Sequence, residues 1–561
     1  MGKRVAWVMA AVVMAAAASV ATAQTAVFQY SVTNDTTRKK KDSEEFEKVT
    51  SFLWLPAEAK QVRGLVVSGQ TLIERQMSKG MREQLREQGI GVLHFRGGVG
   101  SANLQKTLDE YAALSGYKEL SVVPMFFVGH SAGGPAARGL AAEMPERTFG
   151  LMQFRGGAPW AGGPIKDITT QPATQPRDRY VPGYVPSLMM VGQFDEFGGT
   201  RREDGWEPAW MGVAKAIGEQ RAAQPDALWS MVVEPGAGHF AWSERNEQYL
   251  GLFIKKAAAL RIPAAFTADK LPELKKIDAA GGWLADMRLK HPLGNGNTHV
   301  PAPVEKFAGD KGMTSWLFDE EMAKAFVAFH EGIDRKDQFI KWNDPYTIEA
   351  SVRFFFSKQT WVDDGLTLQV HPGYWDVVPK ETKDGKPKWP NEGQAAGNSG
   401  APLKVKNING PFTVVANDKM RLTYDQLAPA GEAGRATFVA YSEGNKEYRY
   451  AEQVGMLPKS FGPNKNPKAA DNAITFEPIA NLKVGSGPVA LKATASSGKP
   501  VEFYVAVGPA RVVDGKLTLA EVPVRASFPI KIKVVAWQGG SYAEPQVKAA
   551  MPVEQEILLE K

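Results

Sequence analysis

The stretch FFVGHSAGG, residues 126–134, decides the fold of the first half of the chain. It is an apolar run that ends in a Gly-x-Ser-x-Gly pattern and continues into a helix-like segment. A serine in a sharp strand-to-helix turn has its hydroxyl lifted clear of the sheet. Glycines on either side are needed because side chains there would collide with neighbouring backbone. The N–H groups of the following helix point at the place where an oxyanion would form. We therefore predict that Ser131 is a nucleophile and that the Ala132 N–H is an oxyanion donor.

Two later segments carry the groups that a serine nucleophile needs. A serine hydroxyl requires a base, and the base requires a carboxylate that holds its tautomer. The apolar run 185–191 leads to Asp195. The run 232–234 leads to a glycine-rich loop that carries His239. The chain order Ser131, Asp195, His239 is typical of groups mounted on the C-terminal ends of successive parallel strands.

Short apolar runs alternate with helix-like segments from about Phe52 to Pro263, which is typical of crossover units and a mainly parallel sheet. The predicted strands are 62–68, 91–95, 125–129, 151–154, 187–192 and 230–234. The predicted helices are 81–88, 104–115, 135–144 and 209–223. The sequence therefore predicts an α/β fold with helices on both faces of the sheet.

On these motifs, residues from about 50 to 262 resemble the α/β-hydrolase superfamily, in its serine-esterase-like form. The resemblance implies that Ser131 is the nucleophile, His239 the general base and acid, and Asp195 the orienting carboxylate. It implies no cofactor. The loop RGGVGS, residues 96–101, is similar to the Arg-Gly-x-Gly-x-Ser loop of these enzymes, with one inserted residue.

Other site residues follow from the same resemblance or from proximity in the sequence. The family commonly places a second oxyanion donor in the turn after the strand at 64–67. That turn reads Ser-Gly-Gln here, so we predict the backbone N–H of Gln70. Trp160 and Trp242 are candidate linings of an acyl or sugar pocket, although aromatic residues pack cores more often than they bind ligands.

The second half of the chain is β-rich. Strand-like runs at 474–476, 489–501 with its Ser-Ser-Gly-Lys-Pro turn, and 534–540 look like a bacterial immunoglobulin-like module of extracellular proteins. The predicted domains are a signal peptide at 1–23, an α/β-hydrolase domain at 24–263, a linker with short helices at 264–345, a β-rich domain at 346–470 and an immunoglobulin-like β-sandwich at 471–561.

The N-terminus has the pattern of an export signal. Lys3 and Arg4 precede an apolar run to Val20, and Ala-Thr-Ala at 21–23 fits a cleavage site before Gln24. No later stretch has the length and apolar purity of a membrane span. We therefore expect a secreted or periplasmic protein whose mature form does not span the membrane.

Composition limits the other possibilities. The chain has 561 residues, which predicts two to four domains. Lys plus Arg number 67 against 61 Asp plus Glu, with one dense basic run at 38–41, so no nucleic-acid partner is predicted. The lack of cysteine excludes disulfides, thiolate metal sites and a cysteine nucleophile. The scattered histidines outside these motifs lack metal-ligand spacing, so no metal is predicted.

The leading interpretation is an exported serine hydrolase that cleaves a small-molecule or polymer-borne carboxylic ester. A peptidase or amidase on the same fold is one alternative. A non-catalytic extracellular adhesion or carbohydrate-binding protein is another, in which the β-rich half would do the work. Only about thirty residues separate Phe154 from Pro186, so we expect a small lid and an open site. The sequence leaves the oligomeric state open.

Overall fold

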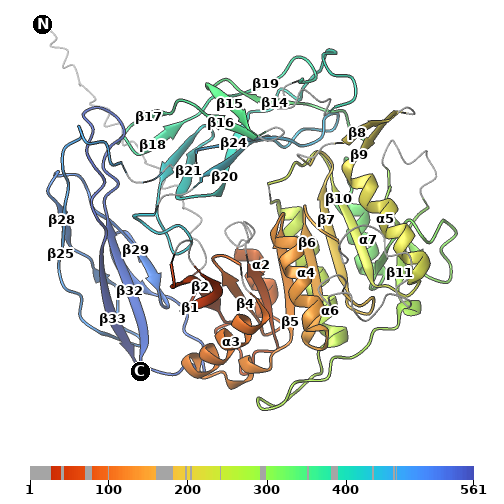
Figure 1. Cartoon of the computed structure of the whole chain (residues 1–561), viewed down its shortest axis with the longest axis horizontal. Helices are drawn as coiled ribbons and strands as arrows, with labels where there is room; N and C mark the ends of the chain where they lie inside the picture. Colours follow the sequence, from red (N-terminus) through yellow and green to blue (C-terminus); the bar gives the residue numbers. More distant parts are fainter. Residues whose placement is uncertain are drawn as a thin grey trace, which may run out of the picture.

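The computed structural model describes three parts of the chain, to which we refer as the N-terminal part (residues 27–330), the middle part (331–462) and the C-terminal part (464–561) (Figure 1). The described residues are 27–561 except 40–42, 70–78, 99, 159–180, 196–198, 203–204, 241, 291–298, 350–352, 381–388, 433–434, 459–461 and 463. The predicted signal peptide, Gln70 and Trp160 lie outside the described residues.

An eight-stranded sheet organises the N-terminal part, with strand order β1-β2-β4-β3-β5-β6-β7-β10. The strands are β1 (Tyr30–Lys39), β2 (Phe46–Trp54), β3 (Gly64–Gly69), β4 (Ile90–Phe95), β5 (Met125–His130), β6 (Thr148–Phe154), β7 (Ser187–Gly192) and β10 (Trp229–Glu234). The strands from β4 to β10 in this order pair in parallel, and β1 and β2 add an antiparallel edge. The predicted α/β class and mainly parallel sheet are confirmed. The two edge strands were not predicted.

Helices cover both faces of this sheet. They are α2 (Lys79–Arg86), α3 (Ser101–Ser115), α4 (Gly133–Glu143), α5 (Ala209–Ala223) and α6 (Glu244–Arg261). Phe126 and Val128 of β5 belong to one apolar core with residues of α2 and α6, while Phe127 belongs to a second core with residues of α3 and α4. A strand buried on both faces needs apolar residues at successive positions, which is why these strands read as continuous apolar runs.

The segment predicted as a linker, residues 264–345, contributes to the same core. It forms a small sheet of β11 (Trp283–Asp286), β12 (Ala302–Pro303) and β13 (Thr314–Leu317), followed by α7 (Glu320–Phe329). At the edge of the main sheet, the Ser315 hydroxyl accepts from the Met231 N–H at 2.9 Å and donates to the Met231 carbonyl at 2.7 Å. One side chain thus occupies both backbone groups of Met231 at an edge that would otherwise remain open for pairing.

The middle part is built from two sheets, β15-β16-β24-β23-β20 and β17-β18-β22-β21, with the pair β14-β19. The strands are β14 (Ile340–Trp342), β15 (Tyr346–Glu349), β16 (Arg353–Phe356), β17 (Thr360–Val362), β18 (Thr367–Gln369), β19 (Pro372–Tyr374), β20 (Lys404–Asn409), β21 (Phe412–Ala416), β22 (Lys419–Leu422), β23 (Thr437–Ser442) and β24 (Ala451–Met456). Apolar side chains from both sheets form one core. The strands β15 and β16 follow one another in the chain and pair as antiparallel neighbours.

The C-terminal part has the sheets β26-β33-β32-β29, β27-β31-β30 and β25-β28. The strands are β25 (Ile474–Phe476), β26 (Leu482–Lys483), β27 (Val489–Ala490), β28 (Ala493–Ala495), β29 (Glu502–Val507), β30 (Ala510–Val513), β31 (Lys516–Leu519), β32 (Ile530–Trp537) and β33 (Val553–Glu560). The prediction that the second half is β-rich is therefore confirmed.

The C-terminal part folds back onto the N-terminal part, and its blue strands lie beside β1 and β2 in Figure 1. The Arg525 guanidinium pairs with the buried carboxylate of Glu119 at 2.9 Å and donates to the Gly116 carbonyl at 3.1 Å. Gly116 and Glu119 precede β5 in the chain, so this contact lies at the N-terminal end of β5, whereas Ser131 follows its C-terminal end. The first and last parts of the described chain are thus in direct contact. None of the helices described combines the length and apolar character needed to cross a bilayer.

His330 joins the end of α7 to the sheet through two hydrogen bonds that require a neutral imidazole. Its Nδ1 donates to the Phe326 carbonyl at 2.8 Å, and its Nε2 accepts from the Val233 N–H at 3.1 Å. The side chain is fully buried, and this burial lowers the pKa of His330 to about 4. Protonation would place a second N–H against that of Val233.

This bonding predicts a loss of stability in acid. The unfolded state takes up the proton near pH 6.5, so stability present above that pH is lost as pH falls toward 4, by about 1.4 kcal/mol per pH unit. In His330→Gln the amide supplies the same donor and acceptor without titrating. Between pH 7.5 and 5.0 the variant should lose about 2 kcal/mol less unfolding free energy than the parent, measured by urea titration. The exposed His299→Gln is the control, and an unchanged pH dependence in His330→Gln would contradict the assignment.

Candidate active site

Ser131 lies in the tight turn between β5 and α4. Its φ is +53°, in the left-handed region that residues other than glycine rarely adopt. The Ser131 N–H donates to the Phe154 carbonyl at 2.9 Å, and its carbonyl accepts from the Gly134 N–H at 2.9 Å. A Cβ at Gly129 would lie 2.1 Å from the Gly133 carbonyl oxygen, so only glycine fits where the strand and helix meet. The surrounding bonds hold the strained turn in place.

Ala132 is the exposed N-cap residue of α4. Backbone N–H groups at a helix start have no acceptor within the helix and carry the positive end of its dipole. An oxyanion donor needs this chemistry, and the role of Ala132 stays a prediction. So do the roles of Gln70 and Trp160, which the structure does not describe.

His239 and Asp195 meet on neighbouring loops. The Nδ1 atom of His239 lies 3.1 Å and 3.0 Å from the two carboxylate oxygens of Asp195. The His239 side chain is 1% exposed and the Asp195 side chain 12% exposed, so solvent competes little for this contact. A proton on Nδ1 that is donated to Asp195 leaves Nε2 as the basic nitrogen, which is the tautomer that a general base requires.

The strands β7 and β10 bring these two loops to one level. They pair in parallel with Gly192 opposite Glu234, the last residue of each strand. Beyond the strands, the Phe194 N–H donates to the Ala237 carbonyl at 2.9 Å, and the Gly236 N–H donates to the side-chain oxygen of Gln193 at 2.8 Å. The Asp195 and His239 loops are therefore joined by one bond between backbone groups and one from a backbone N–H to a side chain, as well as by the contact of Asp195 with His239.

His130 connects the serine turn to the histidine loop. Its Nε2 donates to the His239 carbonyl at 2.8 Å, and the two imidazole rings lie 5.0 Å apart between centroids. Burial, followed by the neighbouring His239, lowers the pKa of His130 to about 3. This imidazole is therefore neutral at physiological pH, as the donor of one hydrogen bond. Because Ser131 follows directly, the bond ties the serine turn to the loop of His239.

No protein-family model matches the sequence, and a comparison with curated proteins gives no match. Solved structures match a part of the chain at low sequence identity and low TM-score. TT1662 from Thermus thermophilus is 18% identical, over 41% of this chain and 99% of that one, with a TM-score of 0.24. Est1E from Butyrivibrio proteoclasticus is 16% identical, over 38% of this chain and 95% of that one, with a TM-score of 0.26. A thermostable carboxyl esterase from Bacillus coagulans is 14% identical, over 40% of this chain and 99% of that one, with a TM-score of 0.26.

The strand order and the mainly parallel pairing of the N-terminal part fit the α/β-hydrolase fold that the sequence resemblance implies. In this fold the C-terminal ends of the strands meet at one edge of the sheet, and here that edge carries Ser131, Asp195 and His239. The three predicted residues, about 110 positions apart at most, therefore follow β5, β7 and β10 at the same edge.

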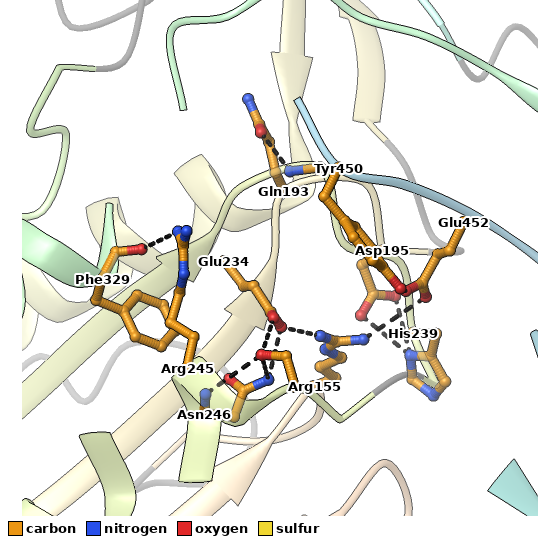
Figure 2. Close-up of polar contacts among 12 residues, drawn as sticks. Arg155, Gln193, Asp195, Glu234, His239, Arg245, Asn246, Phe329, Tyr450 and Glu452 are labelled. Carbon is orange, nitrogen blue, oxygen red and sulfur yellow. Dashed lines mark hydrogen bonds and ion pairs between the residues drawn. The ribbon is translucent and has the colours of Figure 1, made fainter. Parts of the chain in front are cut away.

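A buried ion network adjoins the histidine loop of the α/β-hydrolase sheet, and sequence reasoning missed it (Figure 2). Arg155, just after β6, has a side chain with no exposed surface. Its guanidinium pairs with Glu234, and its Nη1 lies 3.8 Å from the carboxylate of Glu452. Glu234 also accepts from the Asn246 amide at 2.8 Å and from the Ser243 hydroxyl. Two carboxylates thus surround one buried cation.

The middle part lies directly against the histidine loop of this fold. A Cβ at Gly236 would lie 1.7 Å from the Tyr450 carbonyl oxygen, and a Cβ at Gly238 would lie 2.7 Å from a carboxylate oxygen of Glu452. The glycines that we interpreted only as a loop signal are therefore sites of close approach between two parts of the chain. That glycine spacing was the one local sign of the contact.

Aromatic side chains surround a cavity of about 60 Å³ between the histidine loop and the middle part. His239 and Glu452 contribute to its wall, together with six aromatic residues: Phe194, Phe240, Phe339, Phe354, Trp375 and Trp389. We expected an open site with a small lid. Most of the connection from Phe154 to Pro186 lies outside the described residues, so this expectation stays a prediction; on the histidine side, residues of the middle part line the cavity.

Trp242 is only 6% exposed and packs against Phe154, with ring centroids 5.2 Å apart. It also borders a second, polar cavity of about 420 Å³ that Lys406 and Tyr441 help to line. Its substrate role stays a prediction. Within the described ranges, no group of three or more His, Asp or Glu side chains is arranged to hold a metal ion.

The network predicts a large cost for removing its cation. In Arg155→Met, Glu234 and Glu452 would lose the buried cation that lies against both of them, leaving the electrostatic interactions with Lys406 and Arg245, which should cost roughly 3 kcal/mol of unfolding free energy. The triple variant Arg155→Met, Glu234→Gln, Glu452→Gln removes both charges and should recover much of that loss. Urea unfolding at neutral pH measures each, with the exposed Arg511→Met as the control. An Arg155→Met protein as stable as the parent would contradict the network.

Proposed function

We propose that this protein is a serine hydrolase that cleaves carboxylic esters through an acyl-enzyme. The observation that carries the proposal is the contact of His239 Nδ1 with both carboxylate oxygens of Asp195, at the sheet edge where the strained Ser131 turn also lies. This pairing leaves the second imidazole nitrogen as a base for a serine hydroxyl.

In the proposed reaction, the Ser131 hydroxyl oxygen attacks the ester carbonyl carbon while His239 Nε2 takes the hydroxyl proton. Asp195 stabilises the resulting imidazolium, and the Ala132 N–H, with that of Gln70, donates to the oxyanion. His239 then gives the proton to the departing alkoxide. Water attacks the acyl-enzyme with His239 again as base, which releases the acid and restores Ser131.

The neighbouring His130 does not compete for the proton. Its Nε2 already donates to the His239 carbonyl, and its lowered pKa, about 3, keeps it neutral while the reaction runs at neutral pH. We propose esters as the substrates, and an amide substrate is the alternative that cleavage of aminoacyl arylamides would reveal. The substrate is a small-molecule or polymer-borne ester, met outside the cytoplasm after removal of residues 1–23.

Ser131→Ala tests the nucleophile. The variant should lose turnover of short p-nitrophenyl esters by at least about 10³-fold, since no covalent intermediate can form. It should also lose labelling by a fluorophosphonate probe while its unfolding midpoint stays near that of the parent. Ser43→Ala, at an exposed serine, is the matched control. Turnover and labelling that survive in Ser131→Ala would refute the proposal.

Asp195→Asn tests the orienting carboxylate. The amide can donate to His239 Nδ1, which would move the imidazole proton to Nε2 and remove the base. We expect kcat to fall by about 10⁴-fold with little change in KM. Steady-state kinetics on the same esters measure this, with the exposed Asp109→Asn as the control. A kcat within a few-fold of the parent would assign the carboxylate role to another residue.

A further inference from the structure

Glu452 enters the candidate active site from the middle part. It is the second residue of β24, and its side chain is only 5% exposed. Figure 2 shows Glu452 and Tyr450 beside Asp195 and His239, with the guanidinium of Arg155 next to them. A buried carboxylate must be neutralised or hydrogen-bonded, so its surroundings define what it does.

Three contacts fix this carboxylate. The Tyr450 hydroxyl donates to its Oε2 at 2.8 Å, and Arg155 Nη1 lies 3.8 Å from its Oε1. The same Oε1 lies 2.7 Å from the position that a Cβ on Gly238 would occupy. Burial, together with Glu452 itself, raises the pKa of Tyr450 well above its ordinary value, so the phenol keeps the proton that it donates. The Glu452 carboxylate therefore packs between the Arg155 guanidinium and the backbone of the histidine loop at Gly238.

The loop between Glu234 and His239 is held at both ends by this arrangement. Arg155 pairs with Glu234 where the loop begins, and Glu452 packs on Gly238 immediately before His239. Glycine leaves a backbone with many accessible conformations, so a loop with two glycines needs outside contacts to stay in one of them. The contact between His239 and Asp195 depends on that single conformation.

We propose that Glu452 is a positioning residue for His239, so that the middle part completes an active centre otherwise carried by the α/β-hydrolase sheet. The inference rests on the proposed function of Ser131 and His239. A displacement of about 1 Å at a catalytic group reduces rates by about 10²-fold. Glu452, which packs on the histidine loop, therefore affects the rate without contacting the substrate.

The test separates positioning from stabilisation of the interface. Glu452→Gln keeps the size of the side chain and an acceptor for Tyr450 but removes the charge that faces Arg155. Glu452→Asp keeps the charge but withdraws it from Gly238 by one methylene. For both variants in the full chain, kcat on p-nitrophenyl esters should fall by about 10- to 100-fold while KM stays within about two-fold.

A second readout is independent of ester binding and turnover. The rate of fluorophosphonate labelling at Ser131 should fall by the same factor as kcat, because the same base activates the hydroxyl in both reactions. Glu447→Gln is the control. This exposed carboxylate lies five residues before Glu452 and pairs with Lys336, so its removal should leave both rates unchanged.

Each other outcome overturns a distinct statement. If the Glu452 variants unfold at lower urea but keep kcat and the labelling rate, the residue only stabilises the interface and the inference is wrong. If KM rises while kcat is unchanged, Glu452 contacts substrate and is not a positioning residue. If Ser131→Ala stays active, the proposed function itself fails, whatever the Glu452 variants do.

Discussion

A guanidinium with no exposed surface has to be neutralised where it lies, and that requirement at Arg155 organises the centre of this molecule. The carboxylates around it come from two sources, Glu234 at the end of β10 and Glu452 on β24. Glu234 supplies the direct ion pair, and Glu452 brings a second carboxylate from the middle part within 3.8 Å of the same cation, where β24 lies against the main sheet. Once β24 is there, the backbone of Gly236 and Gly238 has no room for side chains, and the histidine loop has one place to lie.

Buried ion pairs rarely provide net stability, because the cost of removing charges from water offsets their attraction. The energy that holds the parts together must come mainly from apolar contacts elsewhere. Between the middle and C-terminal parts, Tyr424 and Trp537 pack with ring centroids 4.8 Å apart. The C-terminal part is also bound to the N-terminal part, through Arg525 and Glu119. Each part thus contacts both others, and this closed arrangement limits how far the middle part can move from the histidine loop.

Local physics explains which features the sequence could predict. The serine turn at Ser131 requires glycines within a few residues, so its pattern is contiguous in the chain. Strands buried on both faces show as apolar runs, and β7 has the predicted bounds, 187–192. The helix at 209–223 also has its predicted bounds. The antiparallel edge strands β1 and β2 were missed because they precede the motifs that carry the resemblance.

The contacts that were missed share a physical origin. Arg155 and Glu452 are about 300 residues apart in the sequence, and no periodicity or turn chemistry relates two residues at that separation. The sequence did contain one sign of the contact between the histidine loop and the middle part, because the loop has glycine at positions 236 and 238. A glycine-rich loop at a strand end is usually interpreted as freedom of the backbone. Here the same glycines mark where a second part of the chain approaches too closely for any Cβ, so the loop is confined rather than free.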